Sequence, residues 1–289
     1  MPEPRFLGVG LGYRQELRKV ILENADSIDF LELLTDQYID MPLRKEQEAR
    51  ELSALFPLVL HGVDLSICTD QPPDLEYVRK IRQVAEWTRP EWISDHLCFT
   101  RVPGLNIGQL TPLSFIDEAA AVAARNIRIV ANELDQPFAV ENISYYFQVP
   151  HSTMTEAEFL TRVITEADCY LLLDLTNVMN NAVNNSYDPA EFLDRIPLER
   201  VLQVHLAGGY WQDGVLLDTH SHPVPTDVLD LLSVTAPRMP ALKAVMIERD
   251  QNFPAGNELL AELHQVRDVL TAAMPEAPWR GRFRAMDTH

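Results

Sequence analysis

The sequence predicts a single (β/α)8 barrel of the TIM type, in the α/β class. Eight short apolar segments with the composition of buried strands are spread along the 289 residues. Segments with helical periodicity lie between them, and no Gly/Ser-rich linker or compositional break divides the chain. Eight strand–helix repeats over this length indicate one closed barrel.

The expected strands and helices alternate along the whole chain. Strands are expected at residues 5–11, 28–34, 57–63, 91–97, 137–142, 169–175, 200–206 and 243–248. Helices are expected at residues 14–24, 44–55, 74–88, 113–134, 156–167, 188–195, 225–235 and 257–273. Asp74 and Asp188 stand where N-terminal caps are expected. Helix starts tolerate proline, and three prolines take such positions: Pro112, Pro189 and Pro225.

Residues 1–275 are expected to form one domain, followed by a C-terminal tail at residues 276–289. The last stretch loses helical periodicity and becomes basic, so a tail is the first interpretation, with a lid or a partner contact as alternatives. The N-terminal residues lack a signal-peptide pattern, and no apolar run reaches membrane-spanning length. A soluble, cytoplasmic protein is expected.

The charge and the cysteines restrict the possible chemistry. The formal net charge is −19, from 24 Lys and Arg against 43 Asp and Glu. Such a surface repels nucleic acid and anionic membranes, so neither is expected as a partner. The cysteines Cys68, Cys98 and Cys169 form no CxxC pair, which argues against a thiolate zinc site and a disulfide framework. Histidine and carboxylate must therefore carry any metal chemistry.

Most of the expected strands end in a residue that can bind metal. The candidate ligands at these ends are His61, His96, Glu141, Asp174, Asn177, His205 and Glu248. Enzymes with this barrel place their active sites at the carboxyl ends of the strands, so these side chains should converge there. A buried carboxylate is costly unless it is paired or metal-bound, which favours ligand roles for the two glutamates. Asp174 has an alternative role as a helix cap.

A second cluster, Asp218, His220 and His222, lies between the last two strands. In an extended segment these three side chains would point to one side, so that two could bind a metal while the third supports them. Asp218 and His220 are taken as metal ligands. Catalytic roles are expected for His222 and for Asp250, which follows the last strand.

The number of candidate ligands is too large for one metal ion. A mononuclear catalytic site commonly uses about three protein ligands, so two or three metals are expected. Four histidines among oxygen ligands suit iron better than magnesium or calcium, with zinc, manganese and cobalt as alternatives.

The motifs, taken in order, resemble the multinuclear non-heme iron-dependent oxidative enzymes, a family that includes the methanobactin biosynthesis oxidase. The similarity runs through GVGLGYR, DFLEL, HGVDLSI, SDHLCF, VENISYY, LLDLTNV, QVHLAGG, DTHSHPVP and IERD. The resemblance implies a xylose isomerase-like barrel with two or three iron ions, in mixed Fe(II) and Fe(III) states, bound by the nine ligands named above.

The resemblance also implies an activity. Members of the family use dioxygen to modify ribosomally made precursor peptides, frequently at cysteine, and often act with a separate partner protein that recognises the leader segment. The residues themselves leave two other classes open. One is a metal-dependent sugar isomerase or a hydrolase such as a phosphodiesterase, and the other is a non-enzymatic metal or peptide carrier. Iron with an oxygen requirement would favour the oxidase, and zinc without one the hydrolase.

Overall fold

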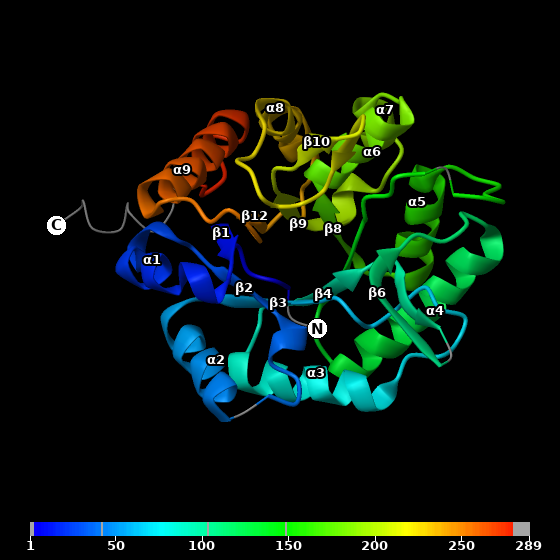
Figure 1. The fold of residues 1–289 in the computed structure, drawn as a ribbon, viewed down its shortest axis with the longest axis horizontal. Helices are drawn as coiled ribbons and strands as arrows, with labels where there is room; N and C mark the ends of the chain where they lie inside the picture. The colour runs from blue at the N-terminus through cyan, green and yellow to red at the C-terminus, as the bar shows by residue number, and fades with distance from the viewer. Residues whose placement is uncertain (1–2, 42, 103, 148, 280–289) are drawn as a thin grey trace.

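Eight parallel strands close into a barrel in the computed structural model, which describes residues 3–41, 43–102, 104–147 and 149–279 (Figure 1). In barrel order the strands are β1 (Gly8–Gly12), β12 (Ala244–Ile247), β9 (Val201–Leu206), β8 (Tyr170–Asp174), β7 (Phe138–Glu141), β4 (Ile93–His96), β3 (Leu58–Gly62) and β2 (Leu31–Leu34). Each overlaps one predicted strand, so the predicted α/β barrel is confirmed.

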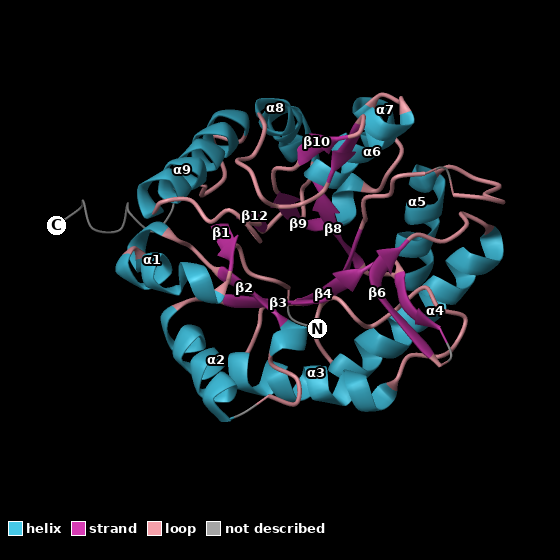
Figure 2. Cartoon of the chain, in the orientation of Figure 1, coloured by secondary structure: helices cyan, strands magenta, loops and turns pink. Residues whose placement is uncertain are grey.

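Helices surround the barrel (Figure 2). They are α1 (Arg18–Glu23), α2 (Leu43–Leu55), α3 (Leu75–Thr88), α4 (Asp117–Leu134), α5 (Glu156–Ala167), α6 (Leu175–Asn185), α7 (Pro189–Leu193), α8 (Thr226–Thr235) and α9 (Gly256–Ala273). Helix α6 follows β8 directly and was not among the expected helices. Within the described ranges, none of these helices is long and apolar enough to cross a membrane.

Both predicted N-terminal caps, Asp74 and Asp188, are confirmed. The Asp74 carboxylate accepts hydrogen bonds from the first turn of α3, and Asp188 caps α7, where Pro189 takes the first position. Pro225 precedes the first residue of α8. The placement of Pro112 at a helix start was wrong, because an irregular segment separates it from the first residue of α4.

Two β-hairpins extend from the carboxyl ends of the barrel strands. The strands β5 (Phe99–Val102) and β6 (Leu105–Thr111) follow β4, and β10 (Tyr210–Gln212) and β11 (Val215–Leu217) follow β9. Neither hairpin was expected, and most residues in both are exposed or half-buried, unlike those of the barrel strands. Together they build up the face of the barrel on which the candidate ligands lie.

The barrel strands are buried on both faces, as is typical of a parallel sheet covered by helices. Every residue of β1, β3 and β9 is buried. Most of these side chains are apolar, so a charged or imidazole side chain in the barrel needs a partner within it. Glu32, His61 and His205 are such side chains.

The start of the predicted tail packs against the N-terminal segment. Trp279 is buried, and its ring lies edge-on to that of Phe6 with ring centroids 4.7 Å apart. The rest of the predicted tail, residues 280–289, lies outside the described residues.

Candidate metal centre

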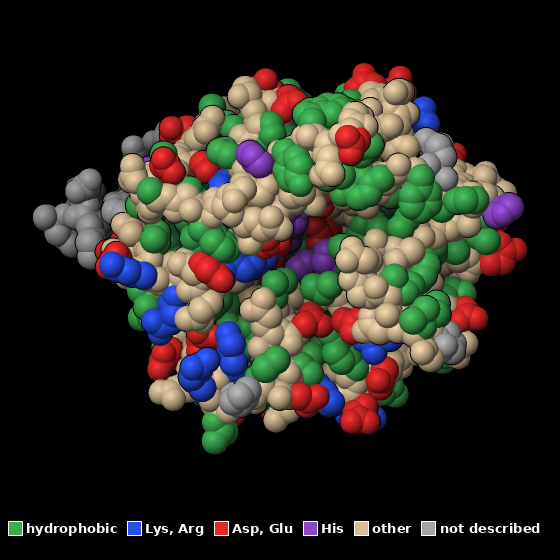
Figure 3. Space-filling view, viewed as in Figure 1, with side chains coloured by type: hydrophobic (Ala, Val, Ile, Leu, Met, Phe, Trp, Pro, Cys, Tyr) green, Lys and Arg blue, Asp and Glu red, His purple; other side chains and the backbone are tan. Residues whose placement is uncertain are grey.

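The candidate ligands converge at the carboxyl ends of the strands because neighbouring strands place them side by side. The register pairs His96 of β4 with Glu141 of β7, and Asp174 of β8 with His205 of β9. Glu248 follows β12 directly. Figure 3 shows histidine and acidic side chains at the bottom of a hollow in the centre of this face.

Three groups of side chains have the geometry to hold a metal ion, and they overlap. In each group the ligand atoms lie within 4.8 Å of one another. The groups are His61, His96 and Glu141; Glu141, Asp174 and His205; and Asp174, His220 and Glu248. Glu141 and Asp174 each belong to two groups, so the site forms a chain of three positions linked by two carboxylates.

In the first group, two imidazole nitrogens are directed at the same point. The Nδ1 of His96 lies 3.1 Å from the carbonyl oxygen of Gly62, which can only accept, so this nitrogen carries the proton. The Nδ1 of His61 lies 2.8 Å from the Oγ of Ser94. Their Nε2 atoms are only 3.4 Å apart, and each lies within 3.3 Å of Glu141 Oε2. This convergence is expected of a metal site.

Glu141 links the first group to the second. Its Oε2 faces the two histidines of the first group, while its Oε1 lies 3.3 Å from His205 Nδ1. Burial alone would raise the pKa of this carboxyl, but His205, His96 and His61 outweigh burial and lower it. Glu141 is therefore ionised and placed to bridge two cations.

Asp174 both caps a helix and faces the centre, so the two roles considered for it are compatible. Its Oδ1 accepts a hydrogen bond of 2.8 Å from the backbone N–H of Asn177 in the first turn of α6. Its Oδ2 is buried. Burial, together with the charges of Asp218 and Glu141, raises the pKa of Asp174 well above its usual range. A cation at this place would relieve that repulsion.

His205 is oriented by Glu32, a residue that was not among the expected site residues. The Glu32 Oε2 lies 3.0 Å from His205 Nε2 and accepts a hydrogen bond of 2.6 Å from Gln203. With Nε2–H donating to Glu32, His205 Nδ1 is left to bind metal between Glu141 and Glu248. Burial would lower the His205 pKa, but Glu32 and Glu141 raise it well above the usual range.

Replacing Glu32 by glutamine is expected to lower metal affinity by about 10- to 100-fold, because the imidazole of His205 loses the carboxylate that fixes its tautomer. Competition with a chelator, followed by metal analysis, measures this change. The exposed Glu23 provides the matched control, and Glu23→Gln should bind metal like the wild type. Unchanged affinity in Glu32→Gln would show that Glu32 does not orient His205.

Arg14, which was also missed, contacts Glu248 of the third group and the nearby Asp250, which lies outside the groups. It donates a hydrogen bond of 2.9 Å to Glu248 Oε1 and pairs with Asp250. Glu248 Oε2 then faces His205 and His220 at 3.5 and 3.3 Å. Asp250 Oδ2 lies 3.1 Å from His220 Nδ1. The position of Arg14 directly after the GVGLGY strand was the sequence signal for this role.

The segment that carries Asp218 and His220 crosses the end of β9. Gly208 and Gly209 permit this approach, because an added Cβ would collide with carbonyl oxygens of residues 217–223. His220 Nε2 lies 2.9 Å from Asp218 Oδ1, and Asp218 Oδ2 accepts a hydrogen bond of 3.1 Å from Ser144. His220 therefore belongs to the third group, and Asp218 contacts it without belonging to any of the three groups.

The expected extended conformation of residues 218–222 was wrong. His220 has a φ of +48°, so the chain turns there and His222 does not share its direction. His222 is exposed, with its Nδ1 2.8 Å from Ser221 Oγ and its ring near that of Tyr210. It belongs to none of the three groups.

This turn predicts different outcomes for two neighbouring histidines. His220→Ala should lose metal and activity, because it removes a ligand atom from the third group. His222→Ala should keep the metal content of the wild type, because its ring lies outside the groups. Metal analysis of both purified variants tests this contrast. A larger metal loss in His222→Ala than in His220→Ala would contradict it.

The donor atoms themselves favour metal binding. Six buried polar atoms in the centre form no hydrogen bond among the described residues, although four of them lie at ion-pair distance from one another or from neighbouring side chains: Glu141 Oε2, Asp174 Oδ2, Asn177 Oδ1, His205 Nδ1, Asp218 Oδ1 and His220 Nε2. Buried polar atoms are rarely left without a partner. Nitrogen and oxygen lone pairs gathered in one place are what a divalent transition metal requires.

Fold and site together define a class, an α/β barrel with a histidine–carboxylate centre able to hold metal at the carboxyl ends of its strands. The chain belongs to the family of RiPP precursor modification enzymes MbnB/TglH/ChrH, whose model matches residues 8–271. As a member, it is an enzyme, and its substrate class is the precursor of a ribosomally synthesised and post-translationally modified peptide.

The chain is also similar in sequence to UPF0276 proteins and similar in fold to solved structures. The chain is 37% identical over 266 residues to a UPF0276 protein of Caulobacter vibrioides, covering 91% of this chain and 94% of that protein. It is 35% identical over 271 residues to a UPF0276 protein of Acaryochloris marina, and the match covers 93% of this chain and 97% of that protein. A xylose isomerase domain protein from Planctomyces limnophilus matches with a TM-score of 0.57 at 14% identity, covering 94% of this chain and 99% of that one. At this identity the structural likeness shows the fold alone, and it confirms the xylose isomerase-like barrel.

Proposed function

We propose that this enzyme is an iron-dependent oxidase that uses dioxygen to modify its precursor peptide at cysteine. The observation that carries the proposal is the chain of three ligand groups joined by Glu141 and Asp174. Two or three iron ions, in mixed Fe(II) and Fe(III) states, would be held by the nine candidate ligands. Bound iron would supply the electrons for reduction of dioxygen, and the protein would supply position and environment.

The donor set supports iron. Four imidazoles and four carboxylates, with the Asn177 amide, meet in the centre, and this mixture suits iron better than magnesium or calcium. Thiolates do not contribute, because Cys68, Cys98 and Cys169 are buried thiols. Burial raises the pKa of Cys98 well above its usual range, so it stays protonated. The reacting thiol would therefore come from the peptide.

The three groups differ in their access to solvent, which suggests different roles. In the middle group, Asp174 and His205 have no exposed surface. The outer groups reach the hollow through the side chains of His96 and His220, which are 11% and 16% exposed. We assign binding of peptide and dioxygen to the outer positions. The middle position is assigned a structural role. Asp250 takes a positioning role through His220 and Arg14.

The surface around the hollow suits a peptide. Large hydrophobic side chains are exposed on the two hairpins and on the loop that follows β7: Val102, Leu105, Ile107, Tyr146, Phe147, Tyr210 and Trp211. Exposed apolar surface of this kind marks interaction sites. We further propose that a separate partner protein recognises the leader segment, as the family resemblance implies.

Co-expression with a candidate precursor peptide and a candidate partner protein, both chosen from neighbouring genes, tests the proposal. Tandem mass spectrometry should find a mass change at a cysteine, and purified protein should require iron and dioxygen for it. A matched anaerobic reaction provides the control. A zinc-loaded enzyme that changes the peptide without oxygen would contradict the oxidase and favour hydrolysis.

A further inference from the structure

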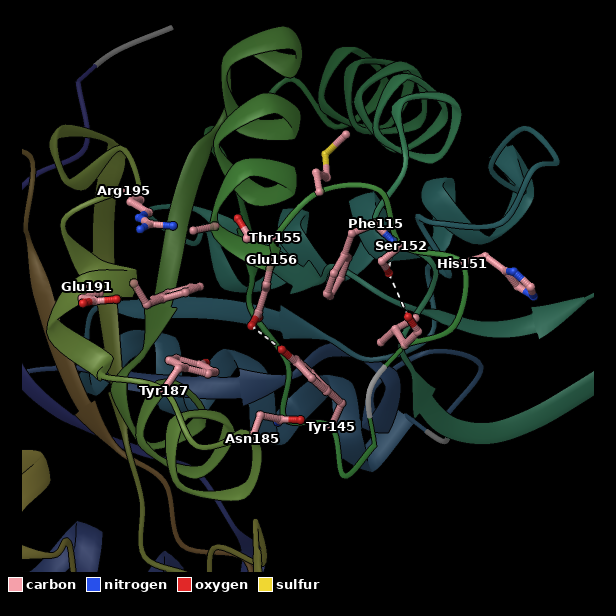
Figure 4. Close-up of a pocket in the computed structure, with 14 residues that line it drawn as sticks. Phe115, Tyr145, His151, Ser152, Thr155, Glu156, Asn185, Tyr187, Glu191 and Arg195 are labelled. Carbon is pink, nitrogen blue, oxygen red and sulfur yellow. Dashed lines mark hydrogen bonds between the residues drawn. The ribbon is translucent and has the colours of Figure 1, made fainter.

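A cavity lies outside the metal centre, and none of its lining residues is a candidate metal ligand (Figure 4). Its volume is about 470 Å³, which is within the usual size for a ligand site. It is lined by the loop after β7, by the N-terminus of α5, and by residues of and around α7.

The walls of the cavity are two pairs of aromatic rings. Phe115 and Tyr145 lie edge to face, with ring centroids 6.0 Å apart. Tyr187 and Phe192 form the other pair at 6.3 Å. Rings of this kind attract a cation placed over their faces.

A carboxylate lies between the two pairs (Figure 4). Glu156 Oε2 accepts a hydrogen bond of 3.0 Å from the Tyr145 hydroxyl. Burial raises the pKa of Glu156 to about 7, although Tyr145 and Asn181 oppose this by hydrogen bonding. A cation in the cavity would favour the ionised form. Glu191 and Arg195, which also line the cavity, are both exposed and carry opposite charges, so Glu156 provides the unbalanced charge.

A second oxygen in the cavity wall can accept a hydrogen bond. The hydroxyl of Tyr187 is buried and has no hydrogen-bond partner among the residues described. Because a hydroxyl group has acceptor lone pairs, it can accept an N–H that also faces the carboxylate. Two oxygen acceptors between aromatic walls match the several N–H donors of a guanidinium or ammonium group.

We propose that this cavity binds a lysine or arginine side chain of the peptide substrate, an inference that rests on the proposed function. Aromatic faces and the Glu156 carboxylate provide recognition of positive charge, and the formal net charge of −19 favours approach of a basic peptide.

One loop joins the cavity to the metal centre. Ser144 donates its hydroxyl hydrogen to the candidate ligand Asp218, while the next residue, Tyr145, forms a wall of the cavity. Asn181 of α6 fixes this loop through Tyr145 N–H and the Ile143 carbonyl. A peptide anchored in the cavity would therefore lie near Asp218 and its neighbour His220 of the third group.

Binding of N-acetyl-L-argininamide and N-acetyl-L-lysinamide, measured by saturation-transfer NMR on the protein as isolated, tests the inference. Both should bind saturably, and the uncharged N-acetyl-L-norleucinamide should bind at least about 10-fold more weakly. Glu156→Gln should weaken binding of the cationic probes about 10-fold. Glu86→Gln, which removes an exposed carboxylate on α3, should leave it unchanged.

Thermal unfolding verifies that each variant is folded, and Tyr187→Leu replaces Glu156→Gln if the latter is not. Equal binding of the norleucine probe, or wild-type binding by the folded cavity variant, would overturn the inference. The assay needs neither turnover nor iron. Cation binding without peptide oxidation would therefore refute the proposed function alone, while oxidation without Glu156-dependent binding would refute this inference alone.

Discussion

Glutamine in place of Glu141 is expected to lower the rate of peptide modification by more than about 100-fold, beyond the 10- to 100-fold typical of residues that only support a ligand. Glu141 is shared by two ligand groups, so its loss affects two metal positions at once. The amide that replaces it would leave His61 and His205 without the negative charge that faces them. Iron per chain, measured by elemental analysis, should fall together with activity.

The exposed Glu199 offers a matched control for this substitution. Glu199→Gln should keep both iron and activity, because no carboxylate of the centre is altered. A folded Glu141→Gln protein with full iron content and full turnover would show that Glu141 does not bridge two metal ions. It would thereby contradict the proposed multinuclear centre.

Removal of metal is expected to destabilise the protein by about 4 kcal/mol, if metal is present at roughly a thousand times its dissociation constant. In a chain of this size such a loss lowers the midpoint of thermal unfolding by about 10 °C. The physical cause is the group of buried carboxylates Glu141, Asp174 and Glu248, which lack a compensating cation once the metal has left. Calorimetry before and after chelation measures the shift.

Adding ferrous iron back under anaerobic conditions should restore the midpoint in the wild type. Glu141→Gln serves as the control, and iron should restore less stability in it because two of the groups are incomplete. Identical unfolding midpoints with and without chelator would mean that the centre binds no metal in the folded protein.

The strand ends were predictable from the sequence because a repeated strand–helix pattern places every strand end on one face. His61, His96, Glu141 and Asp174 each close a short apolar run, which is visible without any tertiary information. Barrel geometry then brings together residues that are far apart in the chain. The two roles considered for Asp174, helix cap and metal ligand, are compatible, because Oδ1 accepts the backbone N–H of Asn177 and Oδ2 forms no hydrogen bond among the described residues.

Glu32 and Arg14 were missed for a different physical reason. Glu32 lies within a strand rather than at its end, and its importance depends on Gln203 and His205, which are more than 170 residues further along the chain. Arg14 acts through Glu248 and Asp250, more than two hundred residues away. The only sequence signal for these roles was a charged residue within or directly after an apolar run, namely Glu32 in DFLEL and Arg14 in GVGLGYR.

Helix α6 was missed because its intrinsic propensity is low. Five of its eleven residues are asparagine, which is a poor helix former. Tertiary contacts replace that propensity: Asn181 binds the loop after β7, and Asn184 binds the backbone of β11. Asparagines therefore lower the helix propensity of this segment, and two of them also form hydrogen bonds to the loop after β7 and to β11.

Anomalous diffraction from crystals of the protein as isolated, recorded on both sides of the iron absorption edge, tests the central claim most directly. The account predicts at least two iron peaks among the three ligand groups, with Glu141 or Asp174 between neighbouring peaks. A single peak, or peaks that belong to zinc, would contradict it.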